Sequence, residues 1–202
     1  MKFIKTEISD VYIIEPSVFG DSRGYFLESY NQKKFEEFIG NISFVQDNES
    51  KSSKGVLRGL HFQKPPFAQA KLVRCIEGKV LDIAVDMRKD SKTFRQHIAV
   101  ELSGENKRQL FVPRGFAHGF LVLSDSATFA YKVDNTYAPE FDAGIRWNDK
   151  ELNIQWGLEE SEVLVSAKDA ELPFFFRICN SIYKLKYESI NYRIERATRI
   201  RN

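Results

Sequence analysis

Histidine is the side chain best suited to moving protons near neutral pH, and this chain has only three histidines. Two of them lie in short apolar segments that contain glycine, His61 in RGLHFQ and His118 in GFAHGF. Arg58 lies three residues before His61, and Lys71 opens the next apolar run, so this region offers a base and two cations. The grouping predicts proton transfer on an anionic substrate. The third histidine, His97, has no such neighbours and is assigned no role.

A metal site is the main alternative use of histidines in a β-barrel. The usual arrangement has two histidines one residue apart on a strand, a carboxylate soon after them and a third histidine later. Here Gln63 stands two residues after His61, and the chain contains no His-x-His pair. With His61 and His118 as the only candidate ligands, a three-histidine site cannot be assembled. We therefore expect a metal-free site.

Two further residues have reactive side chains in less informative surroundings. Asp169 lies in SAKDAELP, just before Pro173, where an aspartate is usually a turn or capping residue. Tyr131 alternates with Phe129 in FAYKVD, which places both on one face of a strand and is typical of a core tyrosine. From these residues alone, neither side chain can be paired with His61.

The elements that would position these residues are mostly strands. Short alternating segments separated by turn residues are typical of β-structure. The expected strands are two that join at Glu77-Gly78 in KLVRCIEGKVLDIAVDM, followed by HIAVELS, QLFVP, HGFLVL and ATFAYKV. Many strands at this spacing predict an all-β sandwich or barrel of the jelly-roll type.

One helix is expected early in the chain, over NQKKFEEFI. Asn31 can cap its start, and Gly40 can end it. Phe35, Phe38 and Ile39 share one face. The fold class predicted from the sequence is therefore all-β with a few short helices.

Length and composition indicate one globular domain. The chain has 202 residues, of which 43% are hydrophobic and 29% charged, enough for one sizeable core. No apolar run approaches the roughly 20 residues of a membrane helix, and the start MKFIKTEISD is too charged for a signal peptide. The two cysteines, Cys75 and Cys179, permit one disulfide, and the apolar run around Cys75 favours a buried thiol. These features predict a cytoplasmic protein with no membrane partner.

Charge is distributed unevenly along the chain. The net charge is +2, but residues 177–202 hold seven Lys or Arg and two Glu, a net of +5, which leaves −3 on the rest. A basic tail can bind nucleic acid or anionic lipid. A solvated or packed tail is the simpler interpretation, so we expect no nucleic-acid partner. Residues 183–187 alternate like a strand, whereas Ile190, Ile194 and Ala197 are spaced like a helix face, and both structures stay open.

Eight stretches, in order along the chain, are FGDSRGYFLESYN, FVQDNESKS, VLRGLHFQ, AQAKLVRCIEGKVLDIAVDMRKDSKTF, ENKRQLFVPRGFAHGFLVLSD, YKVDNTYAPE, IRWNDKELNIQW and SAKDAELP. Together they resemble the dTDP-4-dehydrorhamnose 3,5-epimerase family. The resemblance covers about residues 1–175, the expected domain, and leaves 176–202 as a basic tail. It implies a cupin-type jelly roll and a homodimer with exchanged strands, in which the N-terminal strand KFIKTEI could pair across the interface. It also implies conversion of dTDP-4-dehydro-6-deoxy-D-glucose to dTDP-4-dehydro-L-rhamnose.

The resemblance further implies roles for particular residues. His61 becomes the base, Asp169 the carboxylate that orients it, and Tyr131 the acid on the opposite face. Lys71 would stabilise the enolate oxygen, and Tyr137 would stack on thymine. The contacts to the nucleotide sugar would come from Arg23, Glu28, Gln46, Asn48, Arg58, His118, Asp142 and Lys168. The family tends to place Glu where this chain has Asp142.

The implied chemistry is consistent with these side chains. A ketone at C4 acidifies the hydrogens on C3 and C5, so a base can remove one while the charge moves to the C4 oxygen. Lys71 would meet that charge. Inversion then requires a proton from the other face. Asp169 would hold His61 in one tautomer, as the carboxylate of a catalytic triad does.

Three other functions remain as alternatives. An epimerase that inverts only C3 or C5, or that acts on another nucleotide sugar, would use the same residues. A sugar 3,4-ketoisomerase on a similar barrel would move the ketone to C3. A non-catalytic binding barrel would need no base and acid, and the presence of His61, Tyr131 and Asp169 within the family's motifs argues against it.

Overall fold

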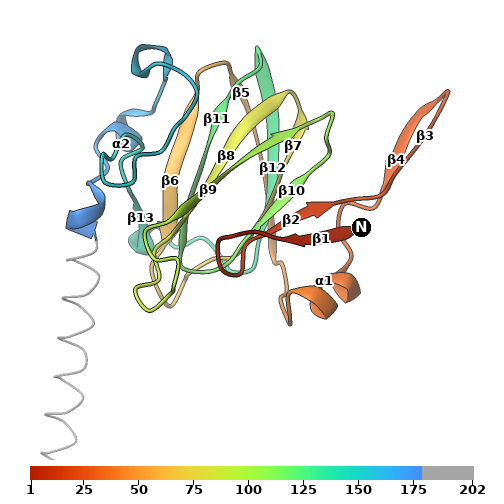
Figure 1. Cartoon of the computed structure of the whole chain (residues 1–202), viewed down its shortest axis with the longest axis horizontal. Helices are drawn as coiled ribbons and strands as arrows, with labels where there is room; N and C mark the ends of the chain where they lie inside the picture. The colour runs from red at the N-terminus through yellow and green to blue at the C-terminus, as the bar shows by residue number, and fades with distance from the viewer. Residues whose placement is uncertain (179–202) are drawn as a thin grey trace, which may run out of the picture.

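The chain folds into two antiparallel sheets that enclose a common core (Figure 1). The computed structural model describes residues 1–178. The first sheet contains, in spatial order, β1 (Lys2–Lys5), β2 (Tyr12–Glu15), β10 (Gln109–Val112), β7 (Lys71–Glu77), β12 (Ser126–Val133) and β5 (Gln46–Ser53). The second contains β13 (Asp142–Gly144), β6 (Leu57–Gln63), β11 (Phe116–Val122), β8 (Lys79–Asp86) and β9 (His97–Ser103). This arrangement confirms the predicted all-β jelly roll.

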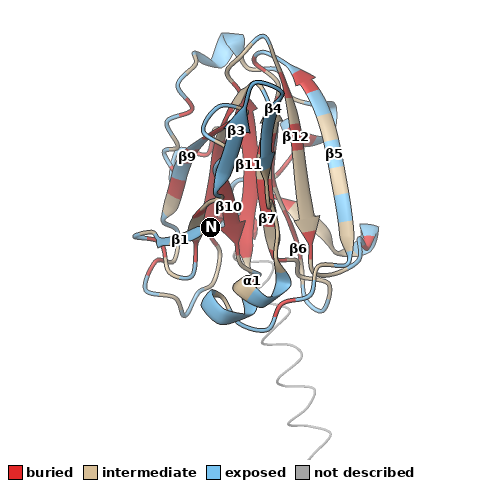
Figure 2. Ribbon diagram, turned by 90° about the vertical axis from the view of Figure 1, so that its right-hand side faces the viewer, coloured by how far each residue is buried: buried red, intermediate tan, exposed pale blue. Residues whose placement is uncertain are grey.

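The core lies between the sheets because the inward side chains of both are largely apolar. Val73 on β7 and Phe129 on β12 pack with Val80 on β8 and Phe120 on β11. Figure 2 shows the buried residues concentrated in the central strands. Removing such apolar surface from water is the main stabilising contribution to a fold of this kind, and it holds the two walls of the barrel at a fixed separation.

The strands predicted from residue 71 to residue 133 are confirmed, but two of them do not lie side by side. β7 and β8 are joined at Gly78 and belong to different sheets. Gly78 has φ +80°, and a Cβ there would lie 2.0 Å from the Ser126 carbonyl oxygen. Only glycine fits this turn, which moves the chain from one sheet to the other. Lys71 on β7 and Asp82 on β8 are therefore carried by opposite walls.

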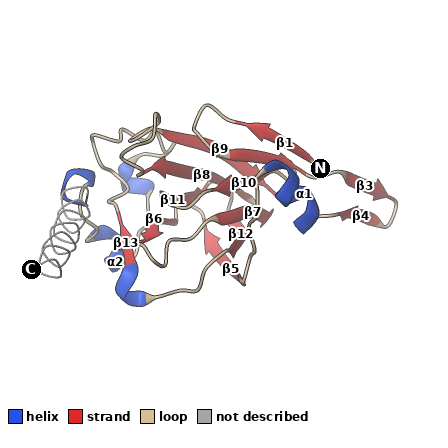
Figure 3. Cartoon of the chain, turned by 90° about the horizontal axis from the view of Figure 1, so that it is seen from below, coloured by secondary structure: helices blue, strands red, loops and turns tan. Residues whose placement is uncertain are grey.

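The helical segments include α1 (Gln32–Phe38), α2 (Ala167–Ala170), η1 (Pro139–Phe141) and η2 (Glu160–Glu162), and residues 175–178 are also helical. Seen from below, α1 and α2 lie toward opposite ends of the molecule (Figure 3). As predicted, the side chain of Asn31 caps α1, and Gly40 follows its end with φ +107°. Phe35 is fully buried, whereas Phe38 is 51% exposed and stacks on Phe3 of the edge strand β1.

β3 (Val18–Asp21) and β4 (Gly24–Leu27) form a separate two-stranded sheet. This hairpin projects from the barrel on the side away from α2 (Figure 1). Its apolar side chains are exposed, with Phe19 at 66% and Phe26 at 70% of their full accessibility. A two-stranded hairpin has little stability alone, and clustered exposed apolar side chains are typical of an interaction surface.

Cys75 is buried, as predicted, and its thiol is free among the residues that the structure describes. Within residues 1–178, no helix has the length and apolar character needed to cross a membrane. The predictions made for Cys179 and for the structure of 179–202 lie outside the described residues.

Candidate active site

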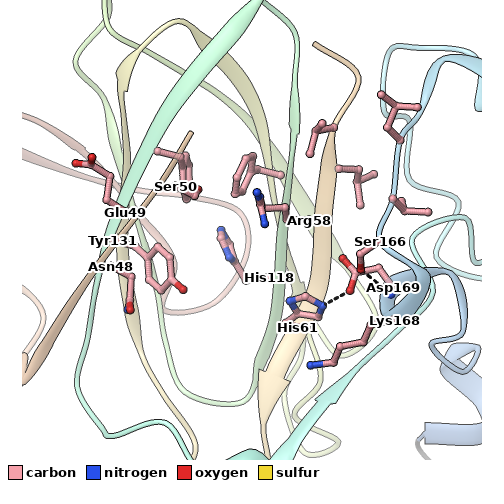
Figure 4. A pocket seen from close by; sticks show the side chains of 16 residues that line it. Asn48, Glu49, Ser50, Arg58, His61, His118, Tyr131, Ser166, Lys168 and Asp169 are labelled. Carbon is pink, nitrogen blue, oxygen red and sulfur yellow. Dashed lines mark hydrogen bonds and ion pairs between the residues drawn. The ribbon is translucent and has the colours of Figure 1, made fainter. Parts of the chain in front are cut away.

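A pocket of about 620 Å³ opens between the two sheets. Residues of β5 and β12 form one wall, residues of β6 and β11 form the other, and residues 164–169 contribute to its rim. The lining includes seven residues predicted from the sequence: Asn48, Arg58, His61, His118, Tyr131, Lys168 and Asp169. Figure 4 shows these side chains arranged around one open space.

Arg58 and His61 line the same pocket because β6 is irregular between them. Side chains alternate along a regular strand, so residues three apart point to opposite faces. The register pairs His118 of β11 with His61 but Phe120 with Arg58, which leaves one extra residue on β6. This β-bulge contains Gly59, whose φ is +125° and whose added Cβ would lie 2.6 Å from a backbone atom of β11. The bulge turns both functional side chains inward.

His61 is held by a carboxylate from a distant part of the chain. Its Nε2 lies 2.8 Å from Oδ1 of Asp169, and Oδ2 accepts a hydrogen bond from the Gly59 amide at 3.2 Å. Asp169 is 4% exposed and lies in α2, which the Ser166 side chain caps. Burial raises the pKa of Asp169, but the hydrogen bonds from His61 and Gly59 outweigh it and lower the pKa overall. The ionised carboxylate accepts the hydrogen on Nε2 and leaves Nδ1 free to take a proton.

Tyr131 faces the pocket from the opposite wall. It lies on β12 beside Asn48 of β5, whereas His61 lies on β6 of the other sheet. Figure 4 shows the phenol and the imidazole on opposite sides of the open space. Burial raises the pKa of Tyr131, although the positive charge of Arg58 opposes this effect, so the hydroxyl stays protonated at neutral pH. The pocket therefore has a proton acceptor on one wall and a proton donor on the other.

Lys71, Asp82 and His118 form a cluster of titratable side chains in the barrel interior. Nε2 of His118 lies 3.0 and 3.1 Å from the two carboxylate oxygens of Asp82. Nζ of Lys71 lies 3.5 Å from the backbone oxygen of His61. Burial lowers the pKa of Lys71 to about 8, while Asp82 and Asp142 oppose that shift. Lys71 is a cation at neutral pH, placed beside the proposed base.

Three of the predicted residues extend the pocket beyond its lining. Asp142 of β13 pairs with Lys168 of α2, and the Tyr137 hydroxyl lies 3.5 Å from the same carboxylate. The hydrogen bond to Asp142 raises the pKa of Lys168. On the other wall, Nε2 of Gln46 donates to Oδ1 of Asn48 at 2.9 Å. Tyr137, Asp142 and Gln46 are thus continuous with the pocket.

Arg23 and Glu28 lie apart from the pocket within one chain. Arg23 lies in the turn of the β3–β4 hairpin, where its side chain is 88% exposed and pairs with Asp21. Glu28 follows the hairpin and accepts hydrogen bonds from Lys34 and Asn31. The hairpin projects away from α2, which carries Lys168 and Asp169 (Figure 1).

The sequence matches the family model described as dTDP-4-dehydrorhamnose 3,5-epimerase over residues 5–176. The chain belongs to this family. Its relatives include the dTDP-4-dehydrorhamnose 3,5-epimerase of Shigella flexneri, 59% identical over 170 residues that cover 84% of this chain and 93% of the relative. The corresponding protein of Salmonella typhimurium is 58% identical over 174 residues, covering 86% and 94%.

Solved epimerase structures have the same fold. A dTDP-6-deoxy-D-glucose-3,5-epimerase from Legionella pneumophila, in complex with dTDP-4-keto-L-rhamnose, matches with a TM-score of 0.86 at 49% identity, covering 90% of this chain and 96% of that chain. A 3'-monoepimerase from Streptomyces bikiniensis, in complex with dTDP-quinovose, gives 0.81 at 28% identity and covers 93% and 95%. The chain is therefore an epimerase, an enzyme of the isomerase class, with a cupin-type jelly roll.

Sequence reasoning missed two polar residues of this epimerase that hold pocket side chains. Asp82 is fully buried against His118. An aspartate in the middle of the apolar strand KVLDIAVD was the available signal, because a buried carboxylate needs a partner. Burial lowers the pKa of His118, although Asp82 opposes this shift, so the imidazole stays neutral. Ser52 accepts a hydrogen bond from Nε of Arg58 at 3.1 Å. It continues a series of polar residues on alternate positions of β5 that the sequence displays as QDNESKS.

The two pocket histidines, His61 and His118, pair separately with Asp169 and Asp82. Within residues 1–178, no three His, Cys, Asp or Glu side chains are grouped so that they could hold a metal ion. The metal-free site stays a prediction, which activity after dialysis against a chelator would check.

Proposed function

We propose that the protein inverts C3 and C5 of dTDP-4-dehydro-6-deoxy-D-glucose and forms dTDP-4-dehydro-L-rhamnose. The observation that carries this proposal is the location of His61 and Tyr131 on facing sheets of one pocket. Inversion requires a proton to leave one face of a carbon and another to arrive at the opposite face. A planar enolate bound between the sheets would meet one of these residues on each face. The product-like ligand of the Legionella pneumophila relative supports the choice of substrate.

His61 is the base in this mechanism. Asp169 accepts the hydrogen on Nε2, so Nδ1 removes the proton from C3 or C5. The resulting imidazolium is stabilised by the carboxylate 2.8 Å away. The electron pair left on carbon moves onto the C4 oxygen, so the substrate's own ketone is the electron sink. This step needs no cofactor.

Lys71 and Tyr131 complete the inversion. The Lys71 ammonium stabilises the enolate oxygen, and one such preorganised donor contributes about 3 kcal/mol to the transition state. Tyr131 then delivers its proton to the opposite face of the carbon and is reprotonated from solvent, while the His61 imidazolium releases its proton to solvent. Repeating the sequence at the second carbon gives the doubly inverted sugar.

The nucleotide binds around the rim of the pocket. Arg58 presents a planar group of donors suited to the pyrophosphate. Tyr137 is 54% exposed and can stack on the thymine ring. The remaining contacts to the nucleotide sugar are Gln46, Asn48, His118, Asp142 and Lys168.

We also propose a homodimer in which the hairpin of one protomer completes the pocket of its partner. In this assembly Arg23 and Glu28 reach the substrate of the other protomer. The exposed hairpin rings Phe19 and Phe26 support this arrangement, because contact with a second chain would bury them. The N-terminal strand β1 pairs with β2 of its own chain and ends the sheet, so its outer edge is available for pairing.

The proposal assigns catalysis to residues 1–175 and treats 176–202 as an appended basic tail. The family match ending at residue 176 supports this division. We propose a cytoplasmic location, which the buried free thiol of Cys75 supports, and partners that include neither nucleic acid nor membrane.

Product analysis by proton NMR in deuterated water tests the reaction. We expect deuterium at C3 and C5 and the L-configured ketone from the native protein, with both abolished in His61→Asn. His97→Asn is the matched control, because His97 lies on β9, outside the pocket, and should keep native activity. Label and inversion at one carbon alone would indicate a single-carbon epimerase. A ketone at C3 would indicate a 3,4-ketoisomerase, and either result would overturn the proposal.

A further inference from the structure

We propose that Gln63 is a positioning residue that fixes the backbone on both sides of Tyr137 and so orients the ring for the thymine of the nucleotide. The inference rests on the proposed function, which gives Tyr137 its stacking role. Gln63 ends β6, two residues after His61, and alternation places both side chains on the same face of the strand. In a metal-binding barrel this position carries the second histidine; here it carries an amide.

The Gln63 amide makes three hydrogen bonds in a nearly closed environment, because the residue is 5% exposed. Nε2 donates to the backbone oxygen of Phe67 at 2.8 Å and to that of Thr136 at 3.1 Å. Oε1 accepts from the backbone amide of Ala138 at 2.7 Å. Thr136 and Ala138 are the two neighbours of Tyr137, so one side chain holds the peptide backbone on both sides of that residue.

The Tyr137 ring is open to a ligand while its backbone is held. The residue is 54% exposed, and its hydroxyl lies 3.5 Å from a carboxylate oxygen of Asp142. Asp142 is in turn the partner of Gln63 in the β6–β13 pairing. Ordering a mobile group on binding costs affinity, so a ring oriented beforehand binds its ligand more tightly. Gln63 orients the ring by holding the backbone of Tyr137, and it leaves the ring itself open to the ligand.

Strand β6 therefore carries residues that act at both ends of the substrate. His61 acts at the sugar carbons, and Gln63, two positions further along β6, fixes the loop that receives the base. The substrate class favoured by this arrangement is a nucleoside diphosphate sugar whose planar base stacks on Tyr137. Loss of the Gln63 hydrogen bonds should weaken binding of the base and leave binding of the pyrophosphate unchanged.

The test is Gln63→Met, which fills the same space without hydrogen-bonding groups. Calorimetry should show the Kd for dTDP raised about tenfold, the loss expected when an anchoring hydrogen-bond network is removed. KM should rise in step, while kcat at saturation and inhibition by inorganic pyrophosphate stay unchanged. In a Tyr137→Ala background, Gln63→Met should weaken dTDP binding no further. It should lower the melting temperature of that variant as much as it lowers the melting temperature of the native protein.

Gln69→Met is the matched control, because Nε2 of Gln69 donates to the Asn135 backbone oxygen in the same loop at 2.8 Å but, within residues 1–178, forms no hydrogen bond with Thr136 or Ala138. It should keep native dTDP affinity, and an equal loss there would overturn the inference. Gln63→Glu keeps the acceptor and loses both donors, so it repeats the measurement if Gln63→Met does not fold. If the Gln63 variants keep native dTDP affinity while Tyr137→Ala loses affinity, this inference is overturned and the stacking role of Tyr137 stands. Unchanged affinity in Tyr137→Ala overturns the stacking role as well.

Discussion

In the proposed mechanism, His61 removes the proton and Tyr131 returns one, because the two side chains stand on different walls of the pocket. In Tyr131→Phe, His61 can still form the enolate and return a proton or a deuteron to the face it came from. We therefore expect isotope exchange at C3 and C5 to continue while inversion falls by about 100- to 10,000-fold. Proton NMR in deuterated water, with product stereochemistry, measures both. Tyr12→Phe on β2 is the control, and a parallel fall of exchange and inversion in Tyr131→Phe would assign Tyr131 to the core.

In the proposed mechanism, Lys71 determines the alkaline side of the pH profile. Burial lowers its pKa to about 8, so the side chain is protonated below that pH and neutral above it. Because the ammonium stabilises the enolate, kcat/KM should fall about tenfold per pH unit above this pKa. Arginine stays charged at alkaline pH, so kcat/KM of Lys71→Arg should not fall above this pH, even if its rate at neutral pH is lower. If the same decline persists in Lys71→Arg, the alkaline limb belongs to another group.

Among the elements, the bulged strand β6 does most to assemble the pocket. Gly59→Ala would place a Cβ 2.6 Å from the backbone of β11 at φ +125°. We expect a loss of about 3 kcal/mol in the free energy of unfolding. Activity should fall further than stability explains, because Arg58 and His61 would lose their common orientation.

Gly40→Ala is the matched control for this prediction. Gly40 also has a positive φ, +107°, but no atom lies within 4 Å of its added Cβ. This variant should show backbone strain alone, with native kcat/KM. Thermal melts and steady-state assays of both variants make the comparison, and native activity in Gly59→Ala would show that the bulge is not needed to orient the pair.

At the scale of the whole molecule, the proposed homodimer predicts complementation between two inactive chains. Arg23→Ala removes the hairpin contribution, and His61→Asn removes the base. In a mixed dimer both defects fall in one pocket, and the other pocket is intact. Co-refolding the two variants should therefore restore activity that neither shows alone, with light scattering confirming dimers. If the hairpin serves its own chain, mixing restores nothing.

Much of the architecture could be predicted because it depends on local pattern. The alternation in HIAVELS and ATFAYKV matches β9 and β12 almost to the residue, since side chains on a strand repeat every two positions. The helix over residues 32–38 could be predicted from Asn31 and Gly40, because helix caps are also local in sequence. The family's motifs can be read directly from the sequence, and they were sufficient to identify His61, Tyr131 and Asp169 as candidate site residues.

Only the tertiary structure decided how those residues meet. Asp169 lies 108 residues from His61 in sequence and reaches it because α2 packs beside the middle of β6, where Asp169 also accepts a hydrogen bond from the Gly59 amide. The extra residue in β6 that turns Arg58 inward depends on the register with β11. Burial of Asp82 and exposure of the Arg23 hairpin depend on which strands share a sheet. Alternation and turns are properties of neighbouring residues, whereas register, burial and docking result from contacts between distant ones, which no local pattern records.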